Sequence, residues 1–287
     1  MIQRIRALTV LCAFWSALSG CGPVKAGLIY YGLVREETDP ALLNEQLQAH
    51  DGWYLPEISD SPYPGVLLVP GCAGTHEFHR AWAQDFVEWG FVALLIDSFR
   101  ARGIETEVEL EAVCEGEKLW GFERAGDVLV SLQRLRTHPQ VNEREIYMIG
   151  WSHGGWAVLD AVALGTENNR PPMLRTPLDQ PLSGVRAVAA LYPYCGFGNH
   201  VARFGWPDDS IRGLFVIAGR DRNIEPEPSI SLATRLRSED LPIELLSLEA
   251  DHWFDNPGGF HIDPHAFSAE ATERTRHAIL TTFGGHN

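Results

Sequence analysis

Apolar and polar residues form regular blocks along this chain from Gly65 onward. Short apolar runs of strand length alternate with segments in which apolar residues recur every three or four positions, as in a helix with one buried face. The predicted strands cover residues 66–69, 91–96, 146–149, 185–191, 214–218 and 243–248. Strand and helix in alternation predict an α/β fold, with a mostly parallel sheet covered by helices on both faces.

Helices are predicted at 82–89, 125–135, after Ser152 and at 230–236, where Ser229 is the expected N-cap. A last helix is predicted to begin at Asp263, with Pro264 at its first position. Before Gly65 the pattern is weaker. Residues 28–34 and 53–58 are predicted as edge strands there.

A GxSxG pentapeptide, Gly150 to Gly154, lies where the strand at 146–149 is predicted to turn into a helix. Glycine lets the backbone pass close to itself in such a tight turn. The turn would expose the Ser152 hydroxyl at the carboxyl end of the strand and leave the amide of His153 free to bind an oxyanion. Because isolated GxSxG matches also occur by chance at helix starts, other parts of the chain must support this interpretation.

Three further loops follow predicted strands, and in a parallel sheet they share the edge on which sites form. The glycine-containing loop 70–75 offers the amide of Cys72 as a second oxyanion donor. Asp221 follows the strand at 214–218, and His252 follows the strand at 243–248. A serine needs a base, and the base needs a carboxylate to fix its tautomer. The sequence therefore predicts Ser152, His252 and Asp221 as nucleophile, base and acid.

These stretches resemble the dienelactone hydrolase family of α/β-hydrolases. The matching segments lie between Val66 and Asp255 and read VLLVPGCAGTHEFHRAWAQDFVEWGFVALLIDSF, IYMIGWSHGG, ALYPYCG, GRD and DHWFD. The resemblance implies an ester or lactone hydrolase in which the catalytic residues and the oxyanion amides are those named above.

The chain departs from the family at two positions. The best known members carry a cysteine nucleophile where this chain has Ser152, which puts the dienelactone substrate itself in doubt. Pro70 and Gly71 stand where many hydrolases have His-Gly. Since only a backbone amide is required there, the second departure does not weigh against catalysis.

Neighbouring residues offer alternative acids and bases. Glu225 is a second candidate for the acid, and His261 and His265 also follow the last predicted strand. Asp251 adjoins His252, but adjacent side chains in an extended segment point to opposite sides. We therefore favour Asp221 and His252.

Metal binding and a cysteine nucleophile have weaker support. His76 and His79 form a short HxxH without an apparent third ligand. Cys72 lacks the strand–turn–helix context of a nucleophile. The expected chemistry requires neither a metal nor an organic cofactor.

The N-terminus is typical of an export signal. Arg4 and Arg6 precede an acid-free apolar run, 7–18, which is shorter than the roughly 20 residues of a membrane span. Residues 18–21, LSGC, resemble the lipobox of bacterial lipoproteins, which implies cleavage before Cys21 and acylation of its thiol. A plain secretory signal is the alternative. Because Gly22 rather than Asp follows, the resemblance places the lipid-anchored chain on the periplasmic face of the cell envelope, at the outer membrane in a Gram-negative organism.

Composition limits the partners. The formal net charge is −15, and a chain this acidic repels phosphate backbones, which argues against a nucleic-acid partner. Hydrophobic residues make up 45% of the chain, enough for residues 21–287 to form a single domain with a full core. The pattern does not specify an oligomeric state.

Three cysteines remain once Cys12 and Cys21 are assigned to the signal and the anchor. An exported chain can form one disulfide among Cys72, Cys114 and Cys195. All three pairings stay open. The pair Cys114–Cys195 is favoured because both residues are expected in loops that follow strands.

The predicted function is hydrolysis of a small ester or lactone through an acyl-enzyme. A serine peptidase on the same fold and a non-catalytic exported binding lipoprotein are the alternatives. Candidate partners for a substrate carboxylate are Arg80, Arg100, Arg102 and Arg222. Candidate walls of an acyl pocket are Trp120, Phe122, Tyr194, Phe197, Trp206, Trp253 and Phe254.

Overall fold

The computed structural model describes residues 22–33, 37–58, 62–166, 171–207, 209–258 and 266–284. Within these ranges the chain forms a seven-stranded sheet in the order β1-β3-β2-β4-β5-β6-β7. Strand β1 is antiparallel to β3, and every other neighbouring pair is parallel. The strands are β1 (Gly52–Tyr54), β2 (Tyr63–Val69), β3 (Val92–Leu95), β4 (Val141–Trp151), β5 (Val185–Leu191), β6 (Arg212–Ala218) and β7 (Ile243–Leu248).

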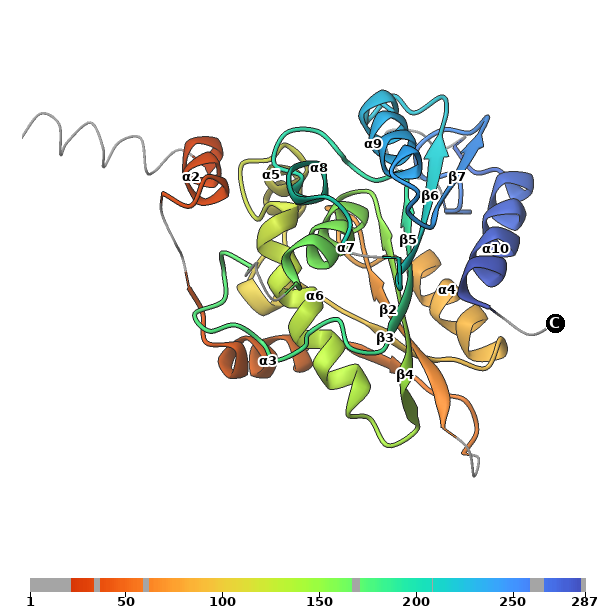
Figure 1. Ribbon diagram of the computed structural model, residues 1–287, viewed down its shortest axis with the longest axis horizontal. Coiled ribbons are helices and arrows are strands. Elements are labelled where there is room, and N and C mark those ends of the chain that lie inside the picture. Colours follow the sequence, from red (N-terminus) through yellow and green to blue (C-terminus); the bar gives the residue numbers. More distant parts are fainter. Residues whose placement is uncertain are drawn as a thin grey trace, which may run out of the picture.

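Helices cover both faces of the sheet, as Figure 1 shows. Helices α6, α7 and α9 contribute to the core on one face, and α4 and α10 contribute to the core on the other. The helices are α2 (Gly22–Tyr30), α3 (Pro40–Gln48), α4 (Glu77–Glu88), α5 (Glu107–Cys114), α6 (Gly121–Arg136), α7 (His153–Leu164), α8 (His200–Phe204), α9 (Glu227–Ser238) and α10 (Ala269–Phe283), with a 3₁₀ turn η1 (Arg100–Arg102). The α/β class predicted from the alternating pattern is confirmed.

Strand β2 shows why the central strands read as continuous apolar runs. Leu67 and Val69 belong to the core beneath α6 and α7, whereas Val66 and Leu68 belong to the core beneath α4. Successive side chains of a strand point to opposite faces, so a strand covered on both sides is apolar at every position. The six predicted strands correspond to β2 through β7.

The N-terminal prediction of a strand at 28–34 is wrong for the residues that the structure describes there, since 28–30 end helix α2. Ala26 and Ile29 of this helix are buried, three positions apart. The run Leu28 to Tyr31 is rich in strand-favouring residues, which explains the error. The predicted edge strand at 53–58 is partly confirmed, because β1 is an edge strand.

Helices α9 and α10 begin at Glu227 and Ala269. Ser229 does not cap α9, because its buried hydroxyl donates to the carbonyl of Pro193 (2.8 Å). At the start of α10, the Ser268 side chain accepts from Ala271 N. The predicted start at residues 263–264 lies outside the described residues, as do the export signal and Cys21.

The disulfide joins Cys72 to Cys114, and the favoured pairing of Cys114 with Cys195 is wrong. Cys114 is the last residue of α5 rather than part of a loop that follows a strand. Helix α5 lies over the loop after β2, where the Leu110 side chain comes within 3.7 Å of the Cβ position of Gly74. Cys195 is a buried free thiol, and burial raises its pKa to about 12.

Removal of this disulfide should weaken the fold. Cys72 and Cys114 are 42 residues apart in sequence, and a crosslink over that distance restricts the unfolded chain enough to stabilise the native state by about 2–4 kcal/mol. Denaturant unfolding of Cys114→Ser should show a loss of this size. Dithiothreitol should bring the wild type to the midpoint of the variant and leave the variant unchanged. A wild type that is insensitive to reduction would argue against the crosslink.

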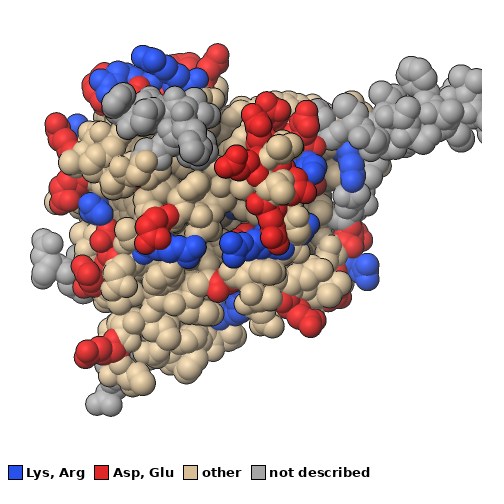
Figure 2. Space-filling view, turned by 180° about the vertical axis from the view of Figure 1, so that it is seen from behind, with Lys and Arg blue, Asp and Glu red and all other residues tan. Residues whose placement is uncertain are grey.

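Charge on the surface is mixed. On the face shown in Figure 2, acidic and basic side chains are interspersed, and acidic ones form a dense cluster near the top. The net charge of the full chain is −15. That nucleic acid is not a partner stays a prediction. Of the helices in the described ranges, none combines the length and the apolar character that a membrane span requires.

Candidate active site

Ser152 lies in a sharp turn between β4 and α7. Its backbone has φ 53° and ψ −115°, a conformation that non-glycine residues rarely adopt and that nucleophilic serines occupy at such turns. A Cβ atom on Gly150 would lie 2.3 Å from the carbonyl oxygen of Gly154, and one on Gly154 would lie 2.0 Å from that of Val69. Both glycines of the pentapeptide are therefore required for the turn to form.

The loop after β2 lies directly against this turn. The Cβ position of Gly71 is 3.5 Å from Cβ of Ser152 and 3.4 Å from the carbonyl oxygen of Trp151. Among the described residues, no acceptor binds the backbone N–H of Cys72, which follows Gly71. His153 is the first residue of α7, so its N–H belongs to the first helical turn, which lacks partners within the helix. In the described ranges, two amides without a hydrogen-bond acceptor therefore lie on the segments next to Ser152.

His252 and Asp221 form a close buried pair. Nδ1 of His252 lies 2.5 Å from Oδ2 of Asp221, and the side chains are 5% and 3% exposed. The other oxygen of Asp221 accepts from the amides of Asn223 and Ile224. These bonds orient the carboxylate, which in turn holds the proton on Nδ1 and leaves Nε2 as the basic nitrogen.

Two contacts connect this pair to the Ser152 turn. Ser152 N donates to the carbonyl of Leu191, and the ring of the next residue, Tyr192, lies 4.5 Å from the ring of His252. The Trp253 side chain comes within 3.8 Å of the Cβ position of Gly71, and Gly71 is also the residue that lies against Ser152. In the described part of the chain, no hydrogen bond joins the Ser152 hydroxyl to His252. Hydrogen bonds between a catalytic serine and its base are often long in the absence of substrate.

Asp255 is a buried carboxylate that the sequence did not identify. Its Oδ2 accepts from the indole N–H groups of Trp82 (3.0 Å) and Trp151 (2.7 Å), and its Oδ1 accepts from the Tyr192 hydroxyl (2.6 Å). Burial raises the pKa of Asp255, and these donors oppose that rise. Asp255 therefore ties the residue before Ser152 to the ring that packs on His252.

The alternative acids and bases are placed elsewhere. Asp251 accepts a hydrogen bond from Arg220 at 3.1 Å, so it is not directed at the ring of His252. Glu225 is exposed, beyond the turn that Asp221 begins. His261 and His265 lie outside the described residues.

His79 is a fully buried histidine on helix α4. Its Nδ1 accepts from the amide of His76 at 3.0 Å, and its ring packs against Phe78 and Trp151. The described residues contain no group of three or more His, Cys, Asp or Glu side chains that could hold a metal ion. Burial keeps the pKa of His79 well below its ordinary value of 6.5.

This depressed pKa predicts a loss of stability in mild acid. Above pH 6.5 His79 is neutral in both folded and unfolded chains. Below pH 6.5 only the unfolded chain binds the proton, so stability falls by up to about 1.4 kcal/mol per pH unit. His79→Asn keeps an acceptor for the His76 amide and removes the titration. The difference in unfolding free energy between wild type and variant should therefore shrink from pH 7.5 to pH 5. A constant difference would contradict this.

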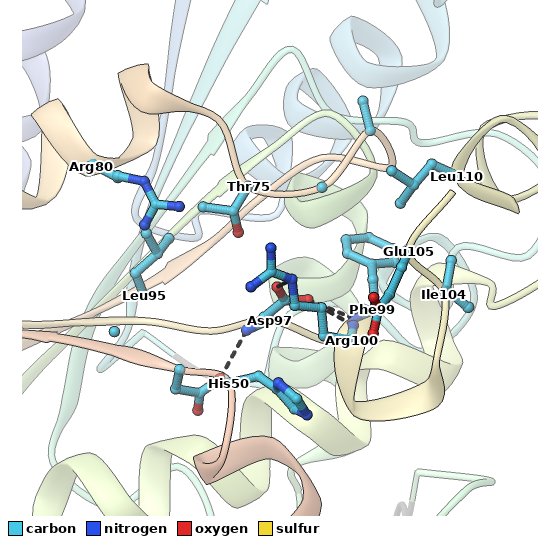
Figure 3. A pocket seen from close by; sticks show the side chains of 14 residues that line it. His50, Thr75, Arg80, Leu95, Asp97, Phe99, Arg100, Ile104, Glu105 and Leu110 are labelled. Carbon is cyan, nitrogen blue, oxygen red and sulfur yellow. Dashed lines mark hydrogen bonds and ion pairs between the residues drawn. The ribbon is translucent and has the colours of Figure 1, made fainter. Parts of the chain in front are cut away.

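Two of the four candidate arginines line a cavity beside the loop after β2. This cavity of about 260 Å³ lies between that loop, α4, the end of β3 and η1, and both Arg80 and Arg100 line it (Figure 3). Arg100 also faces Asp97 at 3.8 Å. Arg102 instead forms a two-bond ion pair with Asp127, and Arg222 is exposed.

The candidate aromatic residues do not form one pocket wall. Trp206 and Phe254 are buried in opposite halves of the core, whereas Phe197 is 54% exposed. The ring of Trp253 lies 5.5 Å from that of His252.

Residues 53–170 match the profile of the Dienelactone hydrolase family. Among curated proteins, the chain is 26% identical over 129 residues to a Synechocystis protein named "Putative carboxymethylenebutenolidase". This match covers 43% of the chain, and it spans only about half of that relative, 52% of its length.

Solved structures resemble the chain over a longer stretch. A dienelactone hydrolase-like promiscuous phosphotriesterase, P91, from metagenomic libraries is 19% identical, with a TM-score of 0.64 over 82% of this chain and 91% of that protein. The esterase Est2 of Thermogutta terrifontis, solved with propionate, is 15% identical, with a TM-score of 0.55 over 82% of this chain and 89% of that protein. The chain has the α/β-hydrolase fold.

Proposed function

We propose that this protein is a serine esterase of the dienelactone hydrolase family that cleaves small esters or lactones. The observation that carries the proposal is the buried contact between His252 and Asp221 beside the strained turn at Ser152. A neutral imidazole held in one tautomer by a carboxylate is the device that activates a serine hydroxyl.

The reaction proceeds in two acyl-transfer steps. Nε2 of His252 takes the proton of Ser152 as its oxygen attacks the ester carbonyl, and the amides of Cys72 and His153 bind the oxyanion. When the C–O bond to the alcohol breaks, the imidazolium gives its proton to the leaving oxygen. Water then attacks the acyl-enzyme with the same base, which releases the acid and restores Ser152.

The proposed substrate class is supported by the similarity to dienelactone hydrolases and esterases, and measurements of turnover on a substrate panel test it. The purified protein should hydrolyse p-nitrophenyl butyrate and a small lactone, and it should leave peptide p-nitroanilides intact. Cleavage of the anilides at a comparable kcat/KM would favour the serine peptidase alternative. No turnover on any member of the panel would favour a non-catalytic binding protein.

We also propose that the protein is exported and held at a membrane through acylated Cys21. Helix α2 follows that residue directly. Tyr31, Phe197 and Phe204, on or near α2 and α8, are exposed, and the guanidinium of Arg203 lies 5.9 Å from the Tyr31 ring and 4.9 Å from the Phe204 ring. Exposed aromatic rings beside an arginine suit a lipid headgroup layer. Cys21→Ser should move the protein from the membrane fraction to the soluble fraction, and unchanged fractionation would contradict the anchor.

A further inference from the structure

Arg124 is a fully buried cation that contacts both segments of the proposed oxyanion site. It lies near the N-terminus of α6, and none of its surface is exposed. An arginine is rarely buried to this extent unless its charge is paired or hydrogen-bonded. Among the described residues Nε of Arg124 has no partner, and the two terminal nitrogens make its hydrogen bonds. The triad mechanism as described above does not use Arg124.

The guanidinium connects the two loops that carry the oxyanion amides. One terminal nitrogen donates to the carbonyl oxygen of Pro70 at 2.9 Å, and the other lies 3.0 Å from Nδ1 of His153. The ring of Phe99 packs on the guanidinium plane, 4.7 Å from Cζ. Pro70 is two residues before Cys72, so each contact reaches one of the two amide-bearing segments.

The protonation states of both partners fit this bridge. Burial and the adjacent Arg124 charge keep the pKa of His153 well below its ordinary value, so its ring is neutral and Nδ1 accepts a hydrogen bond. Burial lowers the pKa of Arg124 to about 10, which leaves it protonated at neutral pH. The bridge from Pro70 through Arg124 to His153 is therefore intact at neutral pH.

Among the described residues, no carboxylate forms an ion pair with Arg124, although the charges of Asp127 and Asp97 favour its protonated form from a longer distance. Asp127, one turn further along α6, is bound at both oxygens by Arg102, at 2.7 and 2.8 Å. Elsewhere in the described ranges, no carboxylate oxygen lies within ion-pair distance of Arg124. The burial of such a cation is unfavourable for the fold unless its hydrogen bonds compensate. A planar group with two donor ends fixes the separation of two acceptors, which a lysine ammonium cannot do.

We propose that Arg124 is a positioning residue that holds the Cys72 loop and the His153 turn at the separation at which their amides bind the oxyanion together. This inference rests on the proposed esterase function. It assigns Arg124 an effect on the transition state, where the oxyanion forms, rather than on substrate binding.

The test compares Arg124→Lys with Arg134→Lys. Arg134 lies on the same helix, where it bonds to Asn44 and Asp51 away from Ser152, so its lysine variant controls for the loss of a buried arginine. Removal of one oxyanion donor slows such enzymes about 10²- to 10³-fold, and misplacement should have a smaller effect. We expect Arg124→Lys to lower kcat for p-nitrophenyl butyrate by about 10- to 100-fold, with KM within about threefold, and Arg134→Lys to retain kcat.

Phenylboronic acid gives a readout that a purely structural role would not move. It forms a tetrahedral adduct with a reactive serine, and the boronate oxygen occupies the oxyanion position. Its inhibition constant should rise in Arg124→Lys by about the factor by which kcat falls, because both depend on the same two amides. In Arg134→Lys it should stay at the wild-type value.

If Arg124→Lys does not fold, a second pair of variants tests the same inference from the side of His153. His153→Leu keeps the backbone amide but removes the acceptor for Arg124, so it should lower kcat and weaken boronate binding together. His153→Asn restores an acceptor and should recover part of that loss. The inference is wrong if the folded variants keep wild-type kcat and boronate affinity, or if KM alone changes. If the wild type neither hydrolyses esters nor binds the boronate, the proposed function fails and the inference fails with it.

Discussion

Replacement of Ser152 by alanine is expected to lower kcat for p-nitrophenyl butyrate by on the order of 10⁵-fold. The variant lacks the oxygen that forms the acyl-enzyme, and His252 has no hydroxyl to deprotonate. Only the oxyanion amides and substrate binding would remain to speed attack by water. The measurement is initial-rate kinetics on purified protein whose circular dichroism and melting temperature match those of the wild type.

Ser229→Ala is the matched control. Ser229 is buried like Ser152, but it lies in the first turn of α9, and its hydroxyl donates to the carbonyl oxygen of Pro193. Its loss should lower stability by about 1 kcal/mol and leave kcat/KM within about twofold of the wild type. Turnover by Ser152→Ala at the wild-type rate would remove Ser152 from the mechanism.

Asp221→Asn is expected to lower kcat by about 10⁴-fold at neutral pH. An asparagine can still accept from Asn223 and Ile224 with Oδ1, so the turn should persist. Its amide group, however, would face Nδ1 of His252 and favour the tautomer in which Nε2 carries the proton. The base would then be unable to accept the proton of Ser152.

Asp251→Asn separates this effect from a general loss of negative charge near His252. Asp251 is adjacent in sequence but is hydrogen-bonded to Arg220, so its variant should keep kcat within about threefold. Equal losses in the two variants would mean that charge near the ring, rather than its tautomer, controls the rate. The assignment of Asp221 as the acid would then be withdrawn.

The elements that the sequence predicted are those whose signal is local. The buried stretches of the inner strands β2 to β6 are apolar at nearly every position, and the turn at Ser152 requires glycines at fixed spacing. His252 and Asp221 each follow a strand, so the parallel topology brings them to one edge. Nδ1 of His252 lies 2.5 Å from Oδ2 of Asp221, and their catalytic roles stay a prediction.

The residues that were missed depend on contacts between distant segments. In the sequence, Arg124 looks like part of the polar face of α6. Its position one helical turn before the buried Val128 could have indicated that it lies on the buried face. Asp255 has no local pattern, because its three donors come from α4, β4 and the end of β5. Cys114 was assigned to the wrong partner because the weak periodicity of α5 hid the helix that carries it.

The account depends most on Ser152 being an activated nucleophile. The most direct measurement is peptide mapping by mass spectrometry after treatment of the folded protein with a fluorophosphonate. The expected result is one adduct, on the peptide that contains Ser152, with labelling abolished in Ser152→Ala and greatly slowed in Asp221→Asn. An unlabelled wild type, or an adduct on another residue that persists in Ser152→Ala, would contradict it.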